Sequence, residues 1–258
     1  MERALSCKIR FLVEGEGRPV TLIHGVGSNL ESWDRVAKRL TPEYLVIRMD
    51  LRGHGRSERI TRACALEDFV SDLVGVLDKA GIQRTDLVGF SLGGMIAQSL
   101  ALARPERVRR LALISAVAGR TPEEMRKLSE RAGKVREQGV GSVLDAADRR
   151  WFTDGFRKRH PEQVKKRLEA LLENDPVSYA EAYRVFAETD MGDRIHQIAH
   201  RTLVVTGEND VGSNPRMARF MHKQIKDSRL VILANLKHGL LVEAPDTVAD
   251  LLLEFLRS

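Results

Sequence analysis

Short apolar runs rich in β-branched residues alternate with segments of helical periodicity along most of this chain. Seven such runs predict strands, at residues 7–13, 19–25, 44–50, 85–90, 108–116, 201–207 and 229–234. Between them, apolar residues recur every three or four positions, as in LESWDRVAKRL and LEDFVSDLVGVLDKAG, which predicts amphipathic helices. Strands and helices in this order favour a parallel sheet covered by helices on both faces.

The alternation stops between Gly119 and about Asp190, where no run predicts a strand. This stretch is instead typical of charged amphipathic helices, including TPEEMRKLSERAGKVREQ and PEQVKKRLEALLE. An all-helical insertion between two parallel strands is expected to lie over the carboxyl edge of the sheet, where open α/β sheets bind ligands. We therefore expect a core formed by residues 1–118 and 191–258 and a helical cap formed by residues 119–190.

Composition limits the classes of partner. The 258 residues are 43% hydrophobic and 30% charged, which is ordinary for a soluble globular protein. The net charge of +6 arises from interleaved basic and acidic residues, and aromatic residues are scarce, so we do not expect a nucleic-acid partner. No apolar stretch approaches the ~18 residues of a membrane span, and the N-terminus lacks the apolar core of a signal peptide. We expect a cytoplasmic protein that does not bind membranes.

Cys7 and Cys64 are the only cysteines of the chain, and they lie far apart without a Cys-x-x-Cys pair or a Cys/His cluster. This spacing disfavours both a zinc site and a disulfide framework. The chain is therefore expected to bind no metal and to work in a reducing compartment.

Gly89-Phe90-Ser91-Leu92-Gly93 stands where a predicted strand turns directly into a predicted helix. A G-x-S-x-G pattern in this context is typical of a nucleophile elbow, a tight turn that presents a serine hydroxyl above the sheet. A hydroxyl is a weak nucleophile, so it needs an adjacent base, a group that orients the base, and donors for the oxyanion that forms. Ser91 is the predicted nucleophile.

The partners of such a serine follow it in the order acid, then histidine. Asp210 comes after the strand predicted at 201–207, and His238 comes after the strand predicted at 229–234. We predict that His238 is the base and that Asp210 orients it. Glu208 stands closer to the strand end, and we interpret it as a structural hydrogen-bond acceptor.

Donors for the oxyanion are expected at two loops. The Leu92 N–H lies at the start of the helix after the serine, and Val26 belongs to the loop HGVG after an early strand. We predict that the backbone N–H groups of Val26 and Leu92 form the oxyanion hole. His24 in this loop and His54 in RGHG are interpreted as loop-organising residues rather than as bases.

The same loop raises a rival hypothesis. Gly25-x-Gly27-x-x-Leu30 follows a strand and opens a helix, and Asp50 ends the next strand, as in a dinucleotide-binding fingerprint. Leu30 replaces the third glycine of that fingerprint, where a side chain hinders close packing of helix and strand. A dinucleotide-dependent oxidoreductase is therefore disfavoured.

Three further residues are candidates for the substrate pocket. Asn29 and Trp33 follow the oxyanion loop, and Trp151 could form the wall of the cap over the substrate. A tryptophan on an amphipathic helix is equally consistent with a place in the core. The basic residues between Arg149 and Arg159 would suit a substrate with a free carboxylate if any of them faced the cleft, and a solvated helix face is the alternative.

The chain resembles the α/β-hydrolase superfamily from about residue 7 to the C-terminus, on five motifs in the family's order: HGVG, DLRGHGRS, GFSLGG, GEND and KHG. Within it, the chain is most similar to the 3-oxoadipate enol-lactonase-like carboxylic-ester hydrolases, because RWFTDGF (150–156) and HPE (160–162) resemble the cap of those lactonases. Its oxyanion loop lacks the proline of the H-P-x-G form that the lactonases often carry. A serine at 91 disfavours dehalogenases and epoxide hydrolases, which carry aspartate there.

The resemblance implies a mostly parallel eight-stranded sheet with helices on both faces and an all-helical cap. It implies a serine hydrolase that cleaves a small-molecule carboxylic ester or lactone through an acyl-enzyme, with Ser91, Asp210 and His238 as its triad and no metal or organic cofactor. It also allows a homodimer, since the caps and edge strands of such proteins both dimerise. Carbon–carbon bond hydrolases and cofactor-free perhydrolases share these motifs, so both stay open, as does a non-catalytic receptor for a small ligand.

Overall fold

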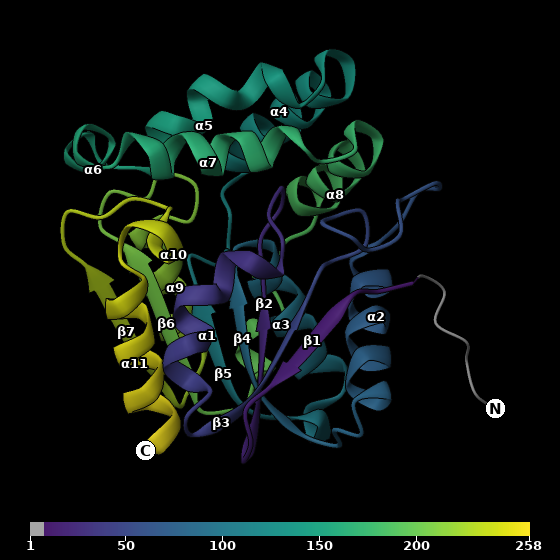
Figure 1. The fold of residues 1–258 in the computed structure, drawn as a ribbon, viewed down its shortest axis with the longest axis vertical. Coiled ribbons are helices and arrows are strands. Elements are labelled where there is room, and N and C mark those ends of the chain that lie inside the picture. The colour runs from purple at the N-terminus through teal and green to yellow at the C-terminus, as the bar shows by residue number, and fades with distance from the viewer. Residues whose placement is uncertain (1–7) are drawn as a thin grey trace.

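One seven-stranded sheet forms the centre of the computed structural model, which describes residues 8–258 (Figure 1). Its strand order is β1-β3-β2-β4-β5-β6-β7. Strand β1 pairs antiparallel with β3, and all other neighbouring strands are parallel, which confirms the predicted mostly parallel sheet. The strands are β1 (Phe11–Glu14), β2 (Arg18–Ile23), β3 (Tyr44–Met49), β4 (Thr85–Phe90), β5 (Val108–Ile114), β6 (Thr202–Gly207) and β7 (Ser228–Leu233).

The described sheet has seven strands rather than the eight that the resemblance implies. Each of the seven apolar runs that predict strands supplies one strand of the sheet, and none is left to form an eighth. The first strand is also shorter than predicted, because it begins at Phe11, while Cys7 lies outside the described residues. Just before this strand, the Arg10 carbonyl accepts the Asp50 N–H at 2.9 Å, so the chain there is tied to the loop after β3.

Strand residues alternate between two hydrophobic clusters, one on each face of the sheet, as the two-residue period of a strand requires. Leu22 and Val88 belong to the cluster on the face covered by α1 and α11. Their neighbours Ile23 and Leu87 belong to the cluster on the face covered by α2, α3 and α9. The core helices are α1 (Asp34–Leu40), α2 (Leu66–Lys79), α3 (Leu92–Ala103), α9 (Pro215–Gln224), α10 (Leu240–Glu243) and α11 (Pro245–Arg257).

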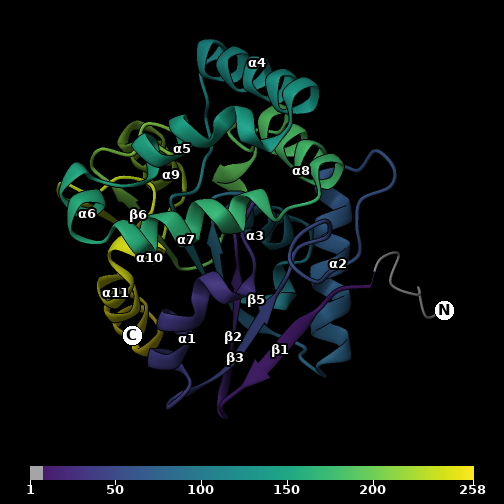
Figure 2. The same cartoon turned by 45° about the horizontal axis from the view of Figure 1, so that its top comes forward.

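The long stretch between β5 and β6 is helical, as the sequence predicts, and contains no strand. Its helices lie together over one edge of the sheet, above the ends of β4, β5 and β6 (Figures 1 and 2). They are α4 (Pro122–Gln138), α5 (Leu144–Trp151), α6 (Asp154–Arg159), α7 (Pro161–Leu172) and α8 (Pro176–Glu188). Across residues 8–258, none of the helices is both long and apolar enough to span a membrane.

The two ends of this helical stretch are joined at one carboxylate. Asp190 accepts the N–H groups of Gly119 at 2.9 Å and Arg120 at 3.1 Å. The first helix then begins with a capping box, in which the Thr121 side chain accepts the Glu124 N–H and the Glu124 side chain accepts the Thr121 N–H. These local bonds define where the chain leaves the sheet and where it returns.

Trp33 provides a test of the core on the α1 and α11 face. Its side chain is fully buried in that cluster. Replacing it with alanine leaves a cavity, so Trp33→Ala should lower the free energy of unfolding by about 3–5 kcal/mol, measured by urea denaturation. Trp33→Phe keeps most of the buried ring and should lose less. A loss below about 1 kcal/mol for the alanine variant would contradict this placement.

Candidate active site

Ser91 occupies the turn between β4 and α3, in a strained backbone conformation. Its φ of 54° lies in the left-handed region, which a non-glycine residue rarely adopts. The turn is possible because glycines flank it. A Cβ on Gly89 would lie 2.3 Å from the Gly93 carbonyl oxygen, and a Cβ on Gly93 would lie 2.3 Å from the Ile23 carbonyl oxygen. The spacing of the G-x-S-x-G motif is thus a packing requirement of the strand, the turn and the helix.

His238 forms a hydrogen-bonded pair with the buried Asp210, and the His238 side chain itself is 17% exposed. The ring Nδ1 of His238 lies 2.7 Å from Oδ2 of Asp210. The other carboxylate oxygen, Oδ1, accepts the N–H groups of Gly212 and Ser213, each at 2.9 Å. Burial acts to raise the pKa of Asp210, but His238 and the two N–H groups outweigh it, so the pKa is lowered. An ionised Asp210 places the proton on Nδ1 and leaves Nε2 free to act as a base.

The loop that carries His238 is hydrogen-bonded to the C-terminal end of α5. The Gly239 N–H donates to the Trp151 carbonyl at 2.7 Å, and the His238 N–H lies 3.5 Å from the Arg150 carbonyl. A Cβ on Gly239 would lie 2.7 Å from that same Trp151 oxygen. The helical segment therefore supports the histidine directly.

Two cavities meet at the predicted nucleophile. We call one the acid-side cavity, because Ser91, Asp210 and His238 all line it. The other, which we call the loop-side cavity, is bounded by the turn after β2. The two share Val26, Ser91, Trp151 and His238. The remaining walls of the loop-side cavity are Gly25, Ser28, Ser32, Phe90, Phe152, Arg167, Gly239, Leu241 and Val242.

The predicted oxyanion donors lie beside Ser91. Val26 lines both cavities, and Leu92 is the first residue of α3. Among the hydrogen bonds of residues 8–258, none uses the backbone N–H of Val26 or Leu92 as a donor. Two N–H groups without an internal partner, one at the positive end of a helix, can hold a developing negative charge.

The structure brings only one of the three predicted pocket residues to the cavities. Trp151 lines both of them. Asn29 lines neither and instead precedes a short 3₁₀ helix, while Trp33 lies in the core. The helical spacing of LESWDRVAKRL, with Trp33 in line with Val36, Ala37 and Leu40, already indicated that core position.

Several residues of the acid-side cavity were not predicted from the sequence. They come mainly from the helical segment, which contributes aromatic and basic side chains to the cavity wall. Tyr179 and Tyr183 stand four residues apart on α8, so one face of that helix carries both. The residues missed in this cavity are Leu128, Arg131, Val143, Ala147, Tyr179, Tyr183, Phe186, Gly212 and Ser213.

Comparison with known families assigns the chain to one of them. A family model described as the alpha/beta hydrolase fold matches residues 18–245. The chain belongs to the α/β-hydrolase family.

This α/β-hydrolase is similar to proteins named as hydrolases and enol-lactonases. It is 30% identical to an (E)-2-((N-methylformamido)methylene)succinate hydrolase of Acinetobacter baylyi over 241 residues, which cover 92% of this chain and 90% of that protein. It is 30% identical to 3-oxoadipate enol-lactonase 2 of the same organism over 217 residues, covering 84% and 80%. Among solved structures, an enol-lactonase from Burkholderia xenovorans matches with a TM-score of 0.92 at 26% identity, covering 98% and 97% of the two chains.

The acidic residue of the rival dinucleotide hypothesis is fully engaged within the protein. Oδ1 of Asp50 accepts the Leu30 N–H at 2.8 Å, and Oδ2 accepts the Arg56 N–H at 2.9 Å and pairs with Arg10 at 3.2 Å. Asp50 therefore joins three segments of the α/β-hydrolase core and has no free oxygen for a ribose.

Among residues 8–258, no group of three His, Cys, Asp or Glu side chains is arranged to hold a metal ion.

Glu208 also has the structural role that the sequence suggested. Its Oε2 accepts the Asn235 N–H at 2.9 Å. This bond joins the loop that carries Asp210 to the loop that carries His238.

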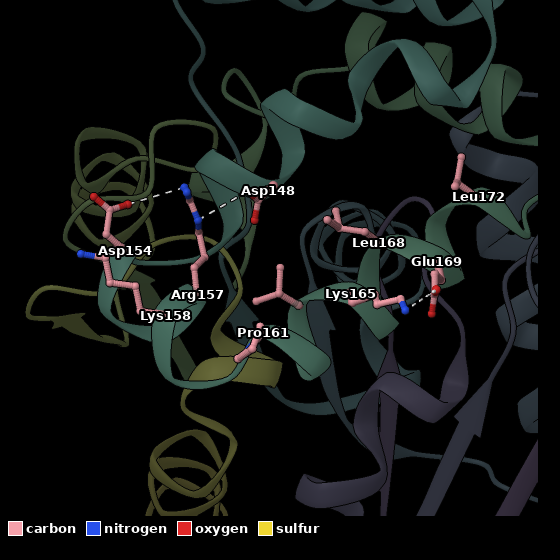
Figure 3. Close-up of a pocket in the computed structure, with 10 residues that line it drawn as sticks. Asp148, Asp154, Arg157, Lys158, Pro161, Lys165, Leu168, Glu169 and Leu172 are labelled. Carbon is pink, nitrogen blue, oxygen red and sulfur yellow. Dashed lines mark ion pairs between the residues drawn. The ribbon is translucent and has the colours of Figure 1, made fainter.

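A larger groove lies on the outer side of the helical segment, along α6 and α7 (Figure 3). Its charged side chains pair with one another, since Arg157 lies 3.5 Å from Asp148 and Lys165 lies 3.9 Å from Glu169. The groove shares no residue with the two cavities at Ser91, and no serine, threonine or cysteine lines it. It is therefore separate from the candidate active site.

Two buried histidines, His24 and His54, hold the loops next to the site in place through hydrogen bonds to backbone groups. Nε2 of His24 accepts the Leu51 N–H, and Nε2 of His54 accepts the Gly27 N–H, both at 3.0 Å. Each Nδ1 donates to a nearby backbone carbonyl, at 2.8 Å for His24 and 2.9 Å for His54. Burial lowers the pKa of His24 well below its ordinary value and lowers the pKa of His54 to about 4, so both rings stay neutral at neutral pH.

The free energy of unfolding should therefore fall as the pH drops from about 6.5 to 4. In the unfolded chain His54 takes up its proton near pH 6.5, whereas in the folded chain it does so only near pH 4. The unfolded state thus binds more protons in this window, and His54 alone accounts for a loss of roughly 3 kcal/mol by pH 4.

Urea denaturation between pH 4 and pH 7.5 measures this loss. His54→Gln keeps an acceptor for the Gly27 N–H but cannot be protonated, so its stability should vary less with pH. A variant with the same pH slope as the parent would show that His54 does not titrate as described.

Proposed function

We propose that this enzyme is a serine hydrolase that cleaves a small carboxylic ester or lactone through an acyl-enzyme. One observation carries the proposal: Ser91, His238 and Asp210, from three separate loops, line one cavity, with Nδ1 of His238 held 2.7 Å from Asp210. A serine beside a histidine that a carboxylate orients is the arrangement that activates a hydroxyl for acyl transfer. Two of the similar proteins are named enol-lactonases, which supports a lactone or an ester as the substrate.

In the first half of the proposed cycle, Nε2 of His238 accepts the Ser91 proton as the serine oxygen attacks the substrate carbonyl carbon. The N–H groups of Val26 and Leu92 hold the negative charge that forms on the carbonyl oxygen. The tetrahedral intermediate then collapses, the bond to the leaving oxygen breaks, and that oxygen takes the proton from His238. Asp210 stays ionised and stabilises the imidazolium.

In the second half of the proposed cycle, water hydrolyses the acyl-enzyme. His238 takes a proton from water as the water oxygen attacks the acyl carbon, and the Ser91 oxygen then leaves with that proton. The net reaction adds one water molecule across the ester bond and yields an acid and an alcohol. For a lactone, the alcohol stays tethered to the acid, so the product is one ring-opened molecule.

In this proposal, residues 119–190 form a cap that shapes the substrate pocket. Helices α4, α5, α7 and α8 each supply side chains to the cavity walls. Because these side chains are mostly apolar or aromatic, the cap would exclude bulk water from the acyl-enzyme. Among them are Leu128, Trp151, Arg167 and Tyr179.

Replacement of Ser91 tests the proposed nucleophile. Ser91→Ala should lower kcat/KM for p-nitrophenyl acetate by several orders of magnitude, because it removes the hydroxyl that forms the acyl-enzyme in this proposal. Ser99→Ala, at a buried serine on α3 outside both cavities, should retain activity. Retention of most activity by Ser91→Ala would rule out the proposed nucleophile.

Replacement of Asp210 tests the role of the carboxylate separately from that of the nucleophile. Asp210→Asn can keep the bonds to Gly212 and Ser213, but its amide favours the wrong tautomer of His238 and cannot stabilise an imidazolium. We expect kcat to fall by roughly 10⁴-fold, as in a serine protease with the same change. A fall of less than about tenfold would argue that the acid lies elsewhere.

A further inference from the structure

Three arginines of the helical segment reach the cavities around Ser91. Arg131 on α4 and Arg150 on α5 line the acid-side cavity, and Arg167 on α7 lines the loop-side cavity. The two cavities share Ser91 and His238. Each cavity that meets Ser91 is therefore lined by at least one positively charged arginine. The only carboxylate that lines either cavity is Asp210, which is already bonded to His238.

None of the three arginines is neutralised within residues 8–258, because none forms an ion pair with a carboxylate there. Arg131 donates to the Tyr183 hydroxyl at 3.3 Å, and Nε of Arg150 donates to the Ala146 carbonyl at 3.0 Å. The guanidinium of Arg167 stacks over the Trp151 ring at 4.4 Å from its centroid, and its Nη1 is buried without a hydrogen-bond partner. These groups keep donors available for a ligand.

Arg131 and Arg150 act on the same space. The Tyr183 hydroxyl interacts with both, and the charge of Arg131 adds to burial in lowering the pKa of Arg150. Burial lowers the pKa of Arg167 to about 10. Guanidinium groups keep their charge in proteins, so Arg131 and Arg150 repel one another, and no carboxylate of residues 8–258 forms an ion pair with any of the three arginines. The three side chains are partly buried, so a negatively charged ligand that pairs with them would offset their mutual repulsion and the loss of hydration.

Nearby basic residues differ from these three. Arg157 pairs with Asp148 and Asp154, at 3.5 and 3.6 Å. Arg149, next to Arg150 on the same helix, is exposed to solvent and lines neither cavity. Arg157 thus has carboxylate partners and Arg149 is solvated, whereas Arg131, Arg150 and Arg167 line the cavities without a carboxylate partner.

We propose that the substrate is a doubly anionic ester or lactone, with one carboxylate bound by Arg131 and Arg150 and a second anionic group bound by Arg167. The planar guanidinium groups suit carboxylates, which accept two parallel N–H bonds. The two carboxylates lie in the two cavities, and the scissile carbonyl lies between them at Ser91. This inference rests on the proposed function, since it assigns the substrate class of the same site.

Four aryl esters separate the contribution of each carboxylate. Phenyl butyrate is neutral, phenyl hemisuccinate carries a carboxylate on the acyl side, and 4-carboxyphenyl butyrate carries one on the leaving group. The mono(4-carboxyphenyl) ester of succinate carries both. For the unmodified enzyme, each carboxylate should raise kcat/KM by about tenfold or more, so the dianion should be the best of the four.

Variants then assign each increment to its arginine. Arg167→Gln should remove the gain from one of the two carboxylates, and Arg131→Gln and Arg150→Gln should each reduce the gain from the other. Arg149→Gln removes the same charge from the adjacent position of α5 and should leave all four values unchanged. A structural role would lower kcat/KM for all four esters together, and that result would contradict the proposal.

The experiment also separates this inference from the proposed function. If the unmodified enzyme cleaves phenyl butyrate through Ser91 at least as fast as the dianion, the doubly anionic substrate class is wrong and the serine hydrolase stands. If hydrolysis of all four esters is absent or survives Ser91→Ala, the serine hydrolase itself is wrong. The preference of the unmodified enzyme decides between these results even where an arginine variant does not fold.

Discussion

The hydrogen bond between His238 and Asp210 is the interaction on which the site depends. It exists because β6 and β7 are parallel neighbours, so the loops that follow them leave the same edge of the sheet. The Glu208 N–H donates to the Leu233 carbonyl and the Asn209 N–H donates to the Leu236 carbonyl, which keeps the two loops in register. A buried carboxylate then has one oxygen for the ring and one for two backbone N–H groups.

The sheet places Ser91 at the same edge by a different means. Strand β4 ends in a turn that only small neighbours allow, and the strain at Ser91 is supported by the close approach of α3 to β2. The helical segment completes the arrangement, since the end of α5 binds the His238 loop through backbone atoms. Core and helical segment are therefore coupled at His238 itself, not only at the walls of the cavities.

Much of this was predictable from the sequence, for physical reasons. A residue that follows a parallel strand must lie at the carboxyl edge, so the positions of Ser91, Asp210 and His238 followed from strand order alone. The burial of Trp33 was visible in its helical spacing with Val36 and Leu40, although its place near the oxyanion loop also suggested a pocket wall. The eighth strand came from the resemblance, and no apolar run supported it.

The arginines that line the cavities around Ser91 could not be assigned in this way. Arg149 and Arg150 are adjacent in a basic stretch, and a helix turns about 100° between them, so the rotation of α5 decides which one faces the cavity. Arg131 and Arg167 stand on separate helices whose meeting depends on how the segment packs. Periodicity indicates the apolar face of each helix but not the partner that the face meets.

Labelling with a fluorophosphonate, followed by peptide mapping by mass spectrometry, tests the central claim most directly, because the reagent reports a hydroxyl activated by a neighbouring base. The account predicts one adduct per chain, on Ser91, and a labelling rate that falls by orders of magnitude in His238→Ala. An adduct on another residue, or Ser91 labelled as fast in His238→Ala as in the parent enzyme, would contradict it.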